Sequence, residues 1–166
     1  MTSLIRFEDW LRRQSIPEHT NTLRLSHQNL RDLEGLARFR ELEFLDCAHN
    51  ALTGLPDLGR NPKLRILNIA HNHIQDLGRL PHGLSSLDCS LNDLIRLPEG
   101  LSNLRQLYCA GNRLTQLPDL SRWPIRVLDA RNNRLSKIPS LPGWITTALF
   151  EGNPIVEDES GDDDPS

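Results

Sequence analysis

Residues 45–56, LDCAHNALTGLP, place a cysteine two residues before a histidine, with an aspartate beside the cysteine. Taken alone, these side chains suggest either a nucleophile with its base or part of a metal site. The same frame recurs along the chain at intervals of 22, 22, 20, 20, 21 and 20 residues. Its anchor residues are Gln28, Asn50, Asn72, Asn92, Asn112, Asn133 and Asn153. The recurrence indicates an internal repeat, and therefore a structural origin for the motif.

Apolar residues occupy three columns around the anchor. Five positions before it stand Leu23, Leu45, Leu67, Leu87, Leu107, Leu128 and Ala148. Three before it stand Leu25, Cys47, Ile69, Cys89, Cys109, Ala130 and Phe150, and two after it stand Leu30, Leu52, Ile74, Leu94, Leu114, Leu135 and Ile155. This alternation is typical of a short strand with one buried face. Stacked in parallel, such strands form a solenoid whose coils bury apolar surface against their neighbours.

The anchor amide is expected to hydrogen-bond backbone groups that the turn leaves unpaired. The return segments are short and contain proline and glycine, as in LPDLGRNPKL (55–64) and LPEGLSNL (97–104). We therefore expect extended chain or single tight turns there. Only GLARFREL (35–42) is expected to form one or two helical turns.

Both ends of a solenoid must be closed. Residues 1–19 are predicted to form a helical cap, residues 20–155 seven repeats of one domain, and residues 156–166 a disordered acidic tail. The expected cap helix begins after Ser3 as its N-cap and ends before Pro17. Its buried side is an apolar stripe of Leu4, Phe7, Trp10 and Leu11. On its exposed side, the ion pairs Glu8–Arg12 and Asp9–Arg13 are expected. A helix lying on a membrane is less favoured, because its polar face carries acids as well as arginines. Phe150, Ile155 and Trp144 are expected to give the far end a thin closure.

Composition restricts the function classes. The formal net charge is −3, and the six acidic groups at the C-terminus leave about +3 on residues 1–155. Neither value favours a nucleic-acid-binding protein, which carries a concentrated basic face. The sequence shows no signal peptide and no apolar stretch of membrane-spanning length. Three cysteines suit a reducing compartment, so a cytoplasmic location is expected. Secretion by a route that needs no signal peptide stays an open alternative.

The cysteines and histidines follow the repeat. Cys47, Cys89 and Cys109 stand in an inward column and are expected to be buried, reduced thiols. His27, His49 and His71 each precede an anchor, about 5 Å apart on successive strands, and with His73 they raise the question of zinc. The same slot later holds Leu91, Gly111, Asn132 and Gly152, so a turn position is the favoured interpretation. We expect no metal and no cofactor.

The residues that alternate with the buried ones point out of the concave face of the sheet. The candidate partner-binding residues are Arg24, Phe44, Asp46, Ile66, Asn68, Asp88, Gln106, Tyr108, Val127, Asp129 and Arg131. An apolar pair, a central tyrosine and a flanking acidic row favour protein binding over chance exposure of apolar side chains. The acidic tail is expected to aid solubility. The alternative is that it lies on a basic strip made of Arg96, Arg113, Arg131, Arg134 and Lys137.

An enzyme is not expected. The aspartates on alternate repeats lie about 10 Å apart, too far for a retaining carboxylate pair, and on an open face that raises no pKa. No nucleophile elbow, phosphate-binding glycine loop or zinc-protease motif occurs. We therefore predict a protein that acts without catalysis or a small-molecule substrate, as a monomer.

The repeat resembles the leucine-rich repeat, with its pattern L-x-x-L-x-L-x-x-N-x-L. Copies of 20 residues with LP after the turn, and IPSLPGWITTALFEGNPI (138–155), are similar to the bacterial class of the IpaH and YopM effectors, without a catalytic domain. The first two intervals are nearer to internalins and a regulatory subunit of protein phosphatase 1. The resemblance implies an α/β solenoid, a right-handed arc with a parallel concave sheet and a mostly extended or 3-10 convex side. It also implies protein recruitment by a recognition module, with a secreted effector and a regulatory subunit as alternatives.

Overall fold

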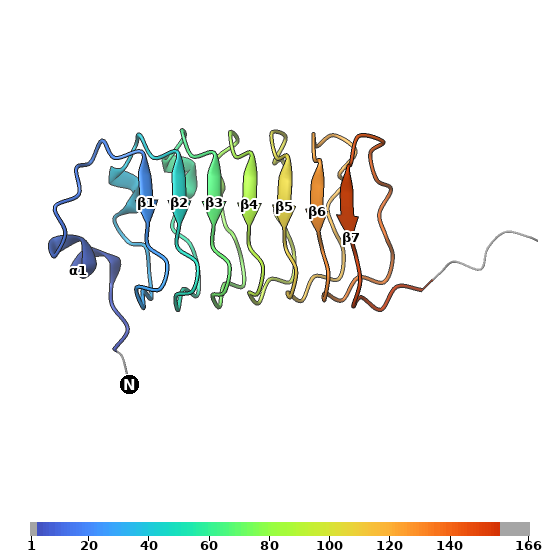
Figure 1. Ribbon diagram of the computed structural model, residues 1–166, viewed down its shortest axis with the longest axis horizontal. Helices are drawn as coiled ribbons and strands as arrows, with labels where there is room; N and C mark the ends of the chain where they lie inside the picture. The colour runs from blue at the N-terminus through green and yellow to red at the C-terminus, as the bar shows by residue number, and fades with distance from the viewer. Residues whose placement is uncertain (1–2, 157–166) are drawn as a thin grey trace, which may run out of the picture.

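Seven short parallel strands form a single sheet in chain order, and each strand comes from one repeat (Figure 1). They are β1 (Thr22–Arg24), β2 (Phe44–Asp46), β3 (Ile66–Asn68), β4 (Ser86–Asp88), β5 (Gln106–Tyr108), β6 (Val127–Asp129) and β7 (Thr147–Leu149). The computed structural model describes residues 3–156 of the chain. The strands lie side by side along the long axis, so the molecule is a β-solenoid, as the repeat predicted.

The register of the sheet reproduces the repeat alignment. Leu23 pairs with Leu45, Leu45 with Leu67, and the column continues in step to Ala148 in β7. The leucines of this column and the residues three positions before each anchor are buried from β1 to β6. Each coil therefore closes its core against the next coil, and the core is continuous along the solenoid.

The return segments are extended chain with tight turns, as expected, and two of them contain a 3-10 turn, η1 (Leu36–Arg38) and η2 (Leu58–Arg60). Both turns lie in the two repeats of 22 residues, where the extra length allows the backbone to coil. Asn61 follows η2 and is fully buried, and its amide donates to the carbonyls of Leu36 at 3.1 Å and Phe39 at 2.9 Å. A side chain of the second coil thus satisfies carbonyl groups at the end of a turn in the first.

The anchor asparagines join successive coils through the backbone. The amide of Asn72 donates to the carbonyls of Cys47 at 3.1 Å and Ile69 at 3.0 Å, and its oxygen accepts the Leu52 N–H at 3.0 Å. Asn92, Asn112, Asn133 and Asn153 make equivalent bonds in their own coils. The predicted hydrogen bonding of the anchors is confirmed, and each amide satisfies backbone groups of two coils.

The residue before each anchor has a left-handed backbone in all seven repeats. The φ angles at His27, His49, His71, Leu91, Gly111, Asn132 and Gly152 lie between 53° and 77°. A left-handed backbone at one residue allows the chain to turn sharply after the strand. This conformation is sterically unfavourable for most residues, and least so for glycine and asparagine. The slot is therefore a turn position, as expected, and Leu91 is its least favourable occupant.

A helix closes the N-terminal end, but it is shorter than predicted. Helix α1 spans Phe7–Arg12, and its N-cap position is Arg6 rather than Ser3. The Phe7 N–H donates to the Asp32 carboxylate at 3.2 Å, so the first coil supplies the cap. The chain before the helix runs extended and pairs with the first coil through Ile5 and Leu30. This strand-like pairing prevents the helix from beginning earlier.

The apolar stripe of the cap is confirmed in part. Phe7 and Leu11 are buried and Trp10 is partly buried, but Leu4 is 53% exposed because it precedes the helix. The Trp10 indole donates to the side-chain oxygen of Gln28 at 3.0 Å. The one anchor that is not an asparagine therefore holds the cap.

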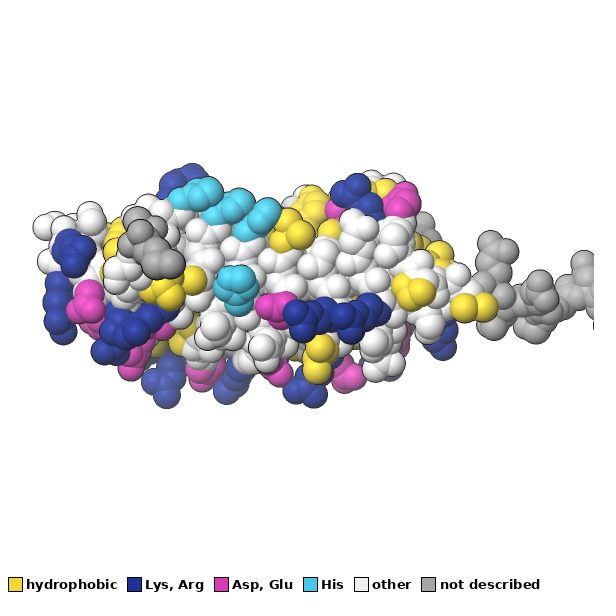
Figure 2. All heavy atoms as spheres, turned by 90° about the horizontal axis from the view of Figure 1, so that it is seen from below, with side chains coloured by type: hydrophobic (Ala, Val, Ile, Leu, Met, Phe, Trp, Pro, Cys, Tyr) yellow, Lys and Arg dark blue, Asp and Glu magenta, His cyan; other side chains and the backbone are white. Residues whose placement is uncertain are grey.

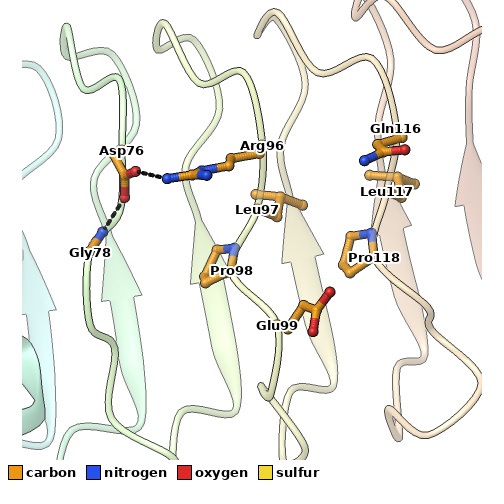
Figure 3. A pocket seen from close by; sticks show the side chains of 9 residues that line it. All are labelled: Asp76, Gly78, Arg96, Leu97, Pro98, Glu99, Gln116, Leu117 and Pro118. Atoms are coloured by element: carbon orange, nitrogen blue, oxygen red, sulfur yellow. Dashed lines mark hydrogen bonds and ion pairs between the residues drawn. The ribbon is translucent and has the colours of Figure 1, made fainter.

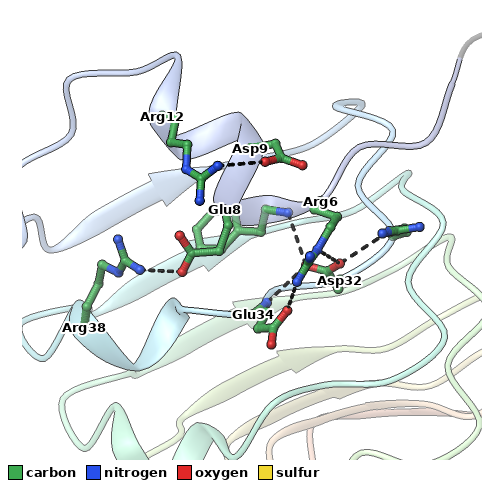
Figure 4. A network of polar contacts seen from close by, with 9 residues as sticks. Arg6, Glu8, Asp9, Arg12, Asp32, Glu34 and Arg38 are labelled. Carbon is green, nitrogen blue, oxygen red and sulfur yellow. Dashed lines mark hydrogen bonds and ion pairs between the residues drawn. The ribbon is translucent and has the colours of Figure 1, made fainter.

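The predicted ion pairs within the helix are wrong. Glu8 pairs with Arg38 of η1, and Asp9 pairs with Arg12 at 3.5 Å (Figure 4). Arg6 pairs with Glu34 and lies 3.8 Å from Asp32, on the segment after the first anchor. The helix of six residues ends before Arg13 and well before Pro17. Glu8 of the helix therefore contacts the first coil, whereas Asp9 pairs within the helix but with Arg12 instead of Arg13.

The C-terminal end is closed thinly, as expected. Ala148, Phe150 and Ile155 are only partly buried, and Trp144 is 43% exposed. Within residues 3–156, no helix has the length and apolar character needed to cross a membrane. Nearly all of the predicted disordered tail lies outside the described residues, and the domain boundaries at residues 19 and 155 stay predictions.

Candidate functional site

The concave face carries the side chains on either side of the buried leucine column. Phe44 and Ile66 are neighbours in register on β2 and β3, and Ile66 is 41% exposed. The guanidinium of Arg24 lies 4.9 Å from the centroid of the Phe44 ring. This cation–π contact partly covers Phe44, which is half-buried. An apolar pair with a cation at its border therefore occupies the N-terminal part of this face.

The acidic row has a structural role that the sequence reasoning missed. Oδ1 of Asp46, Asn68 and Asp88 accepts the backbone N–H two residues further on, at 3.0–3.1 Å. The bond holds the chain where it leaves the strand for the turn. A recurring Asp or Asn four residues before the anchor was the signal for this role. In Asp46 and Asp88, the second carboxylate oxygen takes no part in this hydrogen bond.

Asp129 differs from the other members of the row. It is 8% exposed and binds Arg131 through two bonds, Nε to Oδ1 at 2.9 Å and Nη2 to Oδ2 at 2.7 Å. The hydrogen bonds from Arg131 lower the pKa of Asp129 against the effect of burial. The exposed group at this position is therefore the arginine of a closed ion pair.

The other predicted residues of the face lie on β5 and β6. The Ser86 hydroxyl donates to the Gln106 side-chain oxygen at 3.1 Å, and Tyr108, two residues after Gln106 on β5, is half-buried. Val127 pairs in register with Gln106. The sheet thus brings all the predicted residues to one face. The register of the repeat determines which residue of the next strand lies beside each of them.

Three histidines form a stacked row along the edge of the sheet. The ring centroids of His27 and His49 are 4.3 Å apart, and those of His49 and His71 are 3.9 Å apart, with interplanar angles of 10° and 19°. Figure 2 shows histidine side chains gathered along one side of the face that is seen from below. Partial burial and then the neighbouring imidazoles His71 and His27 lower the pKa of His49. Within residues 3–156, no three His, Cys, Asp or Glu side chains are arranged to hold a metal ion.

Comparison with known proteins agrees with this geometry. The family model for Leucine Rich repeats (2 copies) matches residues 40–82. The chain is a leucine-rich-repeat protein of the bacterial type. A search of the curated proteins finds no match.

Two solved structures resemble this leucine-rich-repeat protein over most of its length. YopM, a leucine-rich effector protein from Yersinia pestis, is 29% identical, with a TM-score of 0.74, over 84% of this chain and 40% of that chain. InlJ from Listeria monocytogenes is 28% identical, with a TM-score of 0.73, over 84% of this chain and 32% of that chain. The protein therefore spans less than half of either structure.

A third structure shares the fold alone. A Shigella effector leucine-rich-repeat domain is 24% identical, with a TM-score of 0.67, and the match covers 90% of this chain and 84% of that domain. The solenoid of this protein therefore has nearly the extent of that domain.

The thiols of this leucine-rich-repeat protein belong to its core. Cys47, Cys89 and Cys109 are free and fully buried, which confirms the predicted inward column. The sulfur of Cys47 lies 3.5 Å from the carbonyl oxygen of Asn68 on the next strand. Burial raises the pKa of each of these thiols, so the reactive thiolate is disfavoured. They are suited to packing and not to nucleophilic attack.

A shallow hollow of about 400 Å³ lies between the return segments of three coils (Figure 3). On its border Arg96 pairs with Asp76 at 2.9 Å, and both side chains are more than half exposed. The Gly78 N–H and Arg96 lower the pKa of Asp76. A carboxylate held ionised in this way is a poor proton donor near neutral pH.

The predicted basic strip is largely neutralised. Arg96 pairs with Asp76, Arg113 with Asp93 at 2.6 Å, and Arg131 with Asp129. Among the described residues, Arg134 and Lys137 make no ion pair, and they alone of the strip carry excess charge. The sequence showed the bases, but Asp76 and Asp93 on neighbouring coils became the partners of Arg96 and Arg113 only through stacking.

Proposed function

We propose that this leucine-rich-repeat protein is a non-enzymatic, cytoplasmic recognition module that binds a protein partner on its concave face. The Phe44–Ile66 pair carries the proposal, because a monomer gains nothing from displaying the exposed Ile66 beside the half-buried Phe44. Aromatic and arginine side chains at the centre of a surface are typical of binding hot spots. Arg24 over Phe44 and the half-buried Tyr108 supply both types.

The chemistry of the face supports binding over catalysis. Asp46 and Asp88 each hold a backbone N–H, and Asp129 is bound to Arg131. The nucleophilic side chains of the core, the three thiols, are fully buried. General acid–base catalysis needs a titratable group with a matched pKa and access to substrate.

A secreted effector that acts on a host protein is the second candidate. The 29% identity to YopM, an effector protein from Yersinia pestis, favours it. Both candidates use the same concave face, so they differ in the location of the partner. A secretion assay in the native organism distinguishes them, since a recognition module of the cytoplasm stays in the cell pellet.

The concave face is tested by removing its apolar pair. The double variant Phe44→Ala/Ile66→Ala is compared with Ile95→Ala/Ile138→Ala, which removes two exposed apolar side chains away from the sheet. Quantitative affinity capture from native lysate should lose its specific partners with the first variant and keep them with the second. Circular dichroism confirms that both variants fold. The proposal fails if both variants retain the same partners as the wild-type protein.

A further inference from the structure

A second hollow lies where the last two strands begin, at the opposite end of the strands from the histidine row. It has a volume of about 310 Å³ and is lined by Ser121, Arg122, Pro124, Arg126 and Trp144. The indole N–H of Trp144 donates to the carbonyl of Trp123 at 3.1 Å. Arg126 donates to the carbonyl of Trp144 at 3.0 Å. A tryptophan that is 43% exposed is thus fixed in position by two hydrogen bonds.

The lining residues are of the types that binding sites favour. Tryptophan and arginine are the residue types most enriched in binding hot spots, because they combine apolar area with directed hydrogen bonding. Among the described residues, neither Arg122 nor Arg126 forms an ion pair, although hydrogen bonds from Ser121 and then the charge of Arg122 lower the pKa of the nearby Asp119. Two guanidinium groups therefore line the hollow beside the indole, and Arg126 has no acidic partner in this part of the chain. A matching ligand presents carboxylates next to a small apolar ring or side chain.

The charge distribution along the chain points in the same direction. Residues 1–119 contain fourteen basic and fourteen acidic side chains, and are neutral as a whole. Residues 120–156 contain five basic and two acidic side chains, and residues 157–166 contain six acidic and no basic ones. The excess positive charge therefore lies on the last coils, directly before the acidic segment.

We propose that the hollow beside Trp144 binds the chain's own residues 157–166, EDESGDDDPS, with their carboxylates on Arg122 and Arg126 and the Pro165 ring against the indole. The Val156 N–H donates to the Ser136 carbonyl at 3.0 Å, which fixes the point from which the segment starts. The segment starts near the turn that follows the strand, whereas the hollow lies where the strands begin. These two places are separated by about six extended residues, or about 20 Å. Ten residues reach up to about 33 Å, so the acidic groups extend as far as the hollow.

Because the acidic segment belongs to the same chain as the hollow, weak contacts are sufficient for binding. An exposed arginine–carboxylate pair contributes little in water and is screened by salt. A segment on the same chain, however, is present at an effective concentration of about millimolar, so several such pairs give substantial occupancy. The contact is independent of the concave face, which leaves the two proposals separately testable.

Paramagnetic relaxation tests the contact in the full-length chain. Ser166→Cys carries a nitroxide label, since the three native thiols are buried. Trp144→Phe assigns the indole N–H signal. At low salt the label should broaden this signal more than those of Trp10 and Trp123, and about 0.5 M sodium chloride should remove the effect.

Matched variants separate the site from general attraction. Arg122→Glu/Arg126→Glu should abolish the broadening, whereas Arg40→Glu, an exposed reversal in the first repeat, should leave at least about half of it. The proposal is overturned if the Arg122→Glu/Arg126→Glu variant and the wild-type protein show equal broadening, or if the wild-type protein shows none. Broadening that passes from a labelled to an unlabelled copy in a mixed sample also overturns it, since a second copy is then the partner.

Discussion

The anchor Asn92 gives the sharpest test of what holds the solenoid together. Its amide donates to the carbonyls of Ile69 at 2.9 Å and Cys89 at 3.2 Å, and its oxygen accepts the Ile74 N–H at 3.0 Å. Two of these three bonds reach the preceding coil. The variant Asn92→Ala removes these three bonds, together with a contact of the amide with the Ser90 carbonyl at 3.2 Å, and leaves the buried Ile74 N–H without its partner.

The expected loss of stability follows from these bonds. Each hydrogen bond contributes about 1 kcal/mol net, so three contribute about 3 kcal/mol. An unpaired buried N–H adds about 1 kcal/mol more, because water does not reach it in the core. We therefore expect Asn92→Ala to lower the free energy of unfolding by about 4 kcal/mol. That is a large part of the roughly 5–15 kcal/mol of a typical domain.

Urea denaturation followed by circular dichroism measures this difference by linear extrapolation. The matched control is Asn103→Ala, which removes one exposed bond from the Asn103 amide to the His82 carbonyl at 2.8 Å. It should cost less than about 1 kcal/mol. Hydrogen exchange at the Ile74 amide should accelerate only in the Asn92 variant. A loss below about 1 kcal/mol, or one equal to the control, would refute the reasoning that the anchors join the coils.

Three further predictions concern the strand ends and turns. Asp88→Asn should leave the melting temperature nearly unchanged, since an amide oxygen still accepts the Ser90 N–H, whereas Asp88→Ala should cost about 1 kcal/mol in the same thermal melts. Leu91→Asn should stabilise the protein by about 0.5–1 kcal/mol, because asparagine tolerates the left-handed backbone better; a lower melting temperature would contradict this. Arg131 lowers the pKa of Asp129, so the pair stabilises the fold above the ordinary aspartate pKa of about 3.9 and loses this contribution as the pH falls below it. Melting temperatures between pH 6 and pH 3 should fall less steeply in Arg131→Gln, and parallel curves would contradict the assignment.

The repeat made the buried columns predictable. A column such as Leu45, Leu67 and Leu87 recurs with the same spacing, so the sequence alone identified the strand, its buried face and its register. The same recurrence placed Cys47 among leucines and assigned its thiol to the core. The residues on the concave face were placed by elimination, since whatever alternates with a buried column must face out.

Contacts between coils were not predictable in the same way. Glu8 was expected to pair with Arg12, four positions along a helix, and instead reaches Arg38 of the first coil. Ser3 was the expected N-cap, yet Asp32 supplies the cap from a distant segment. In both cases the partner is brought near only when the helix packs on the solenoid.

The sequence by itself determined the period of this protein, the inward or outward direction of each strand residue, and the uncharged character of its core. These follow from local rules, because alternation and spacing act within one coil. Only the tertiary structure decided which acids neutralise Arg96 and Arg113, how the imidazoles stack, and that Trp144 lies beside two arginines that form no ion pair among the described residues. These depend on the stacking of neighbouring coils, which brings together side chains about twenty residues apart in the chain.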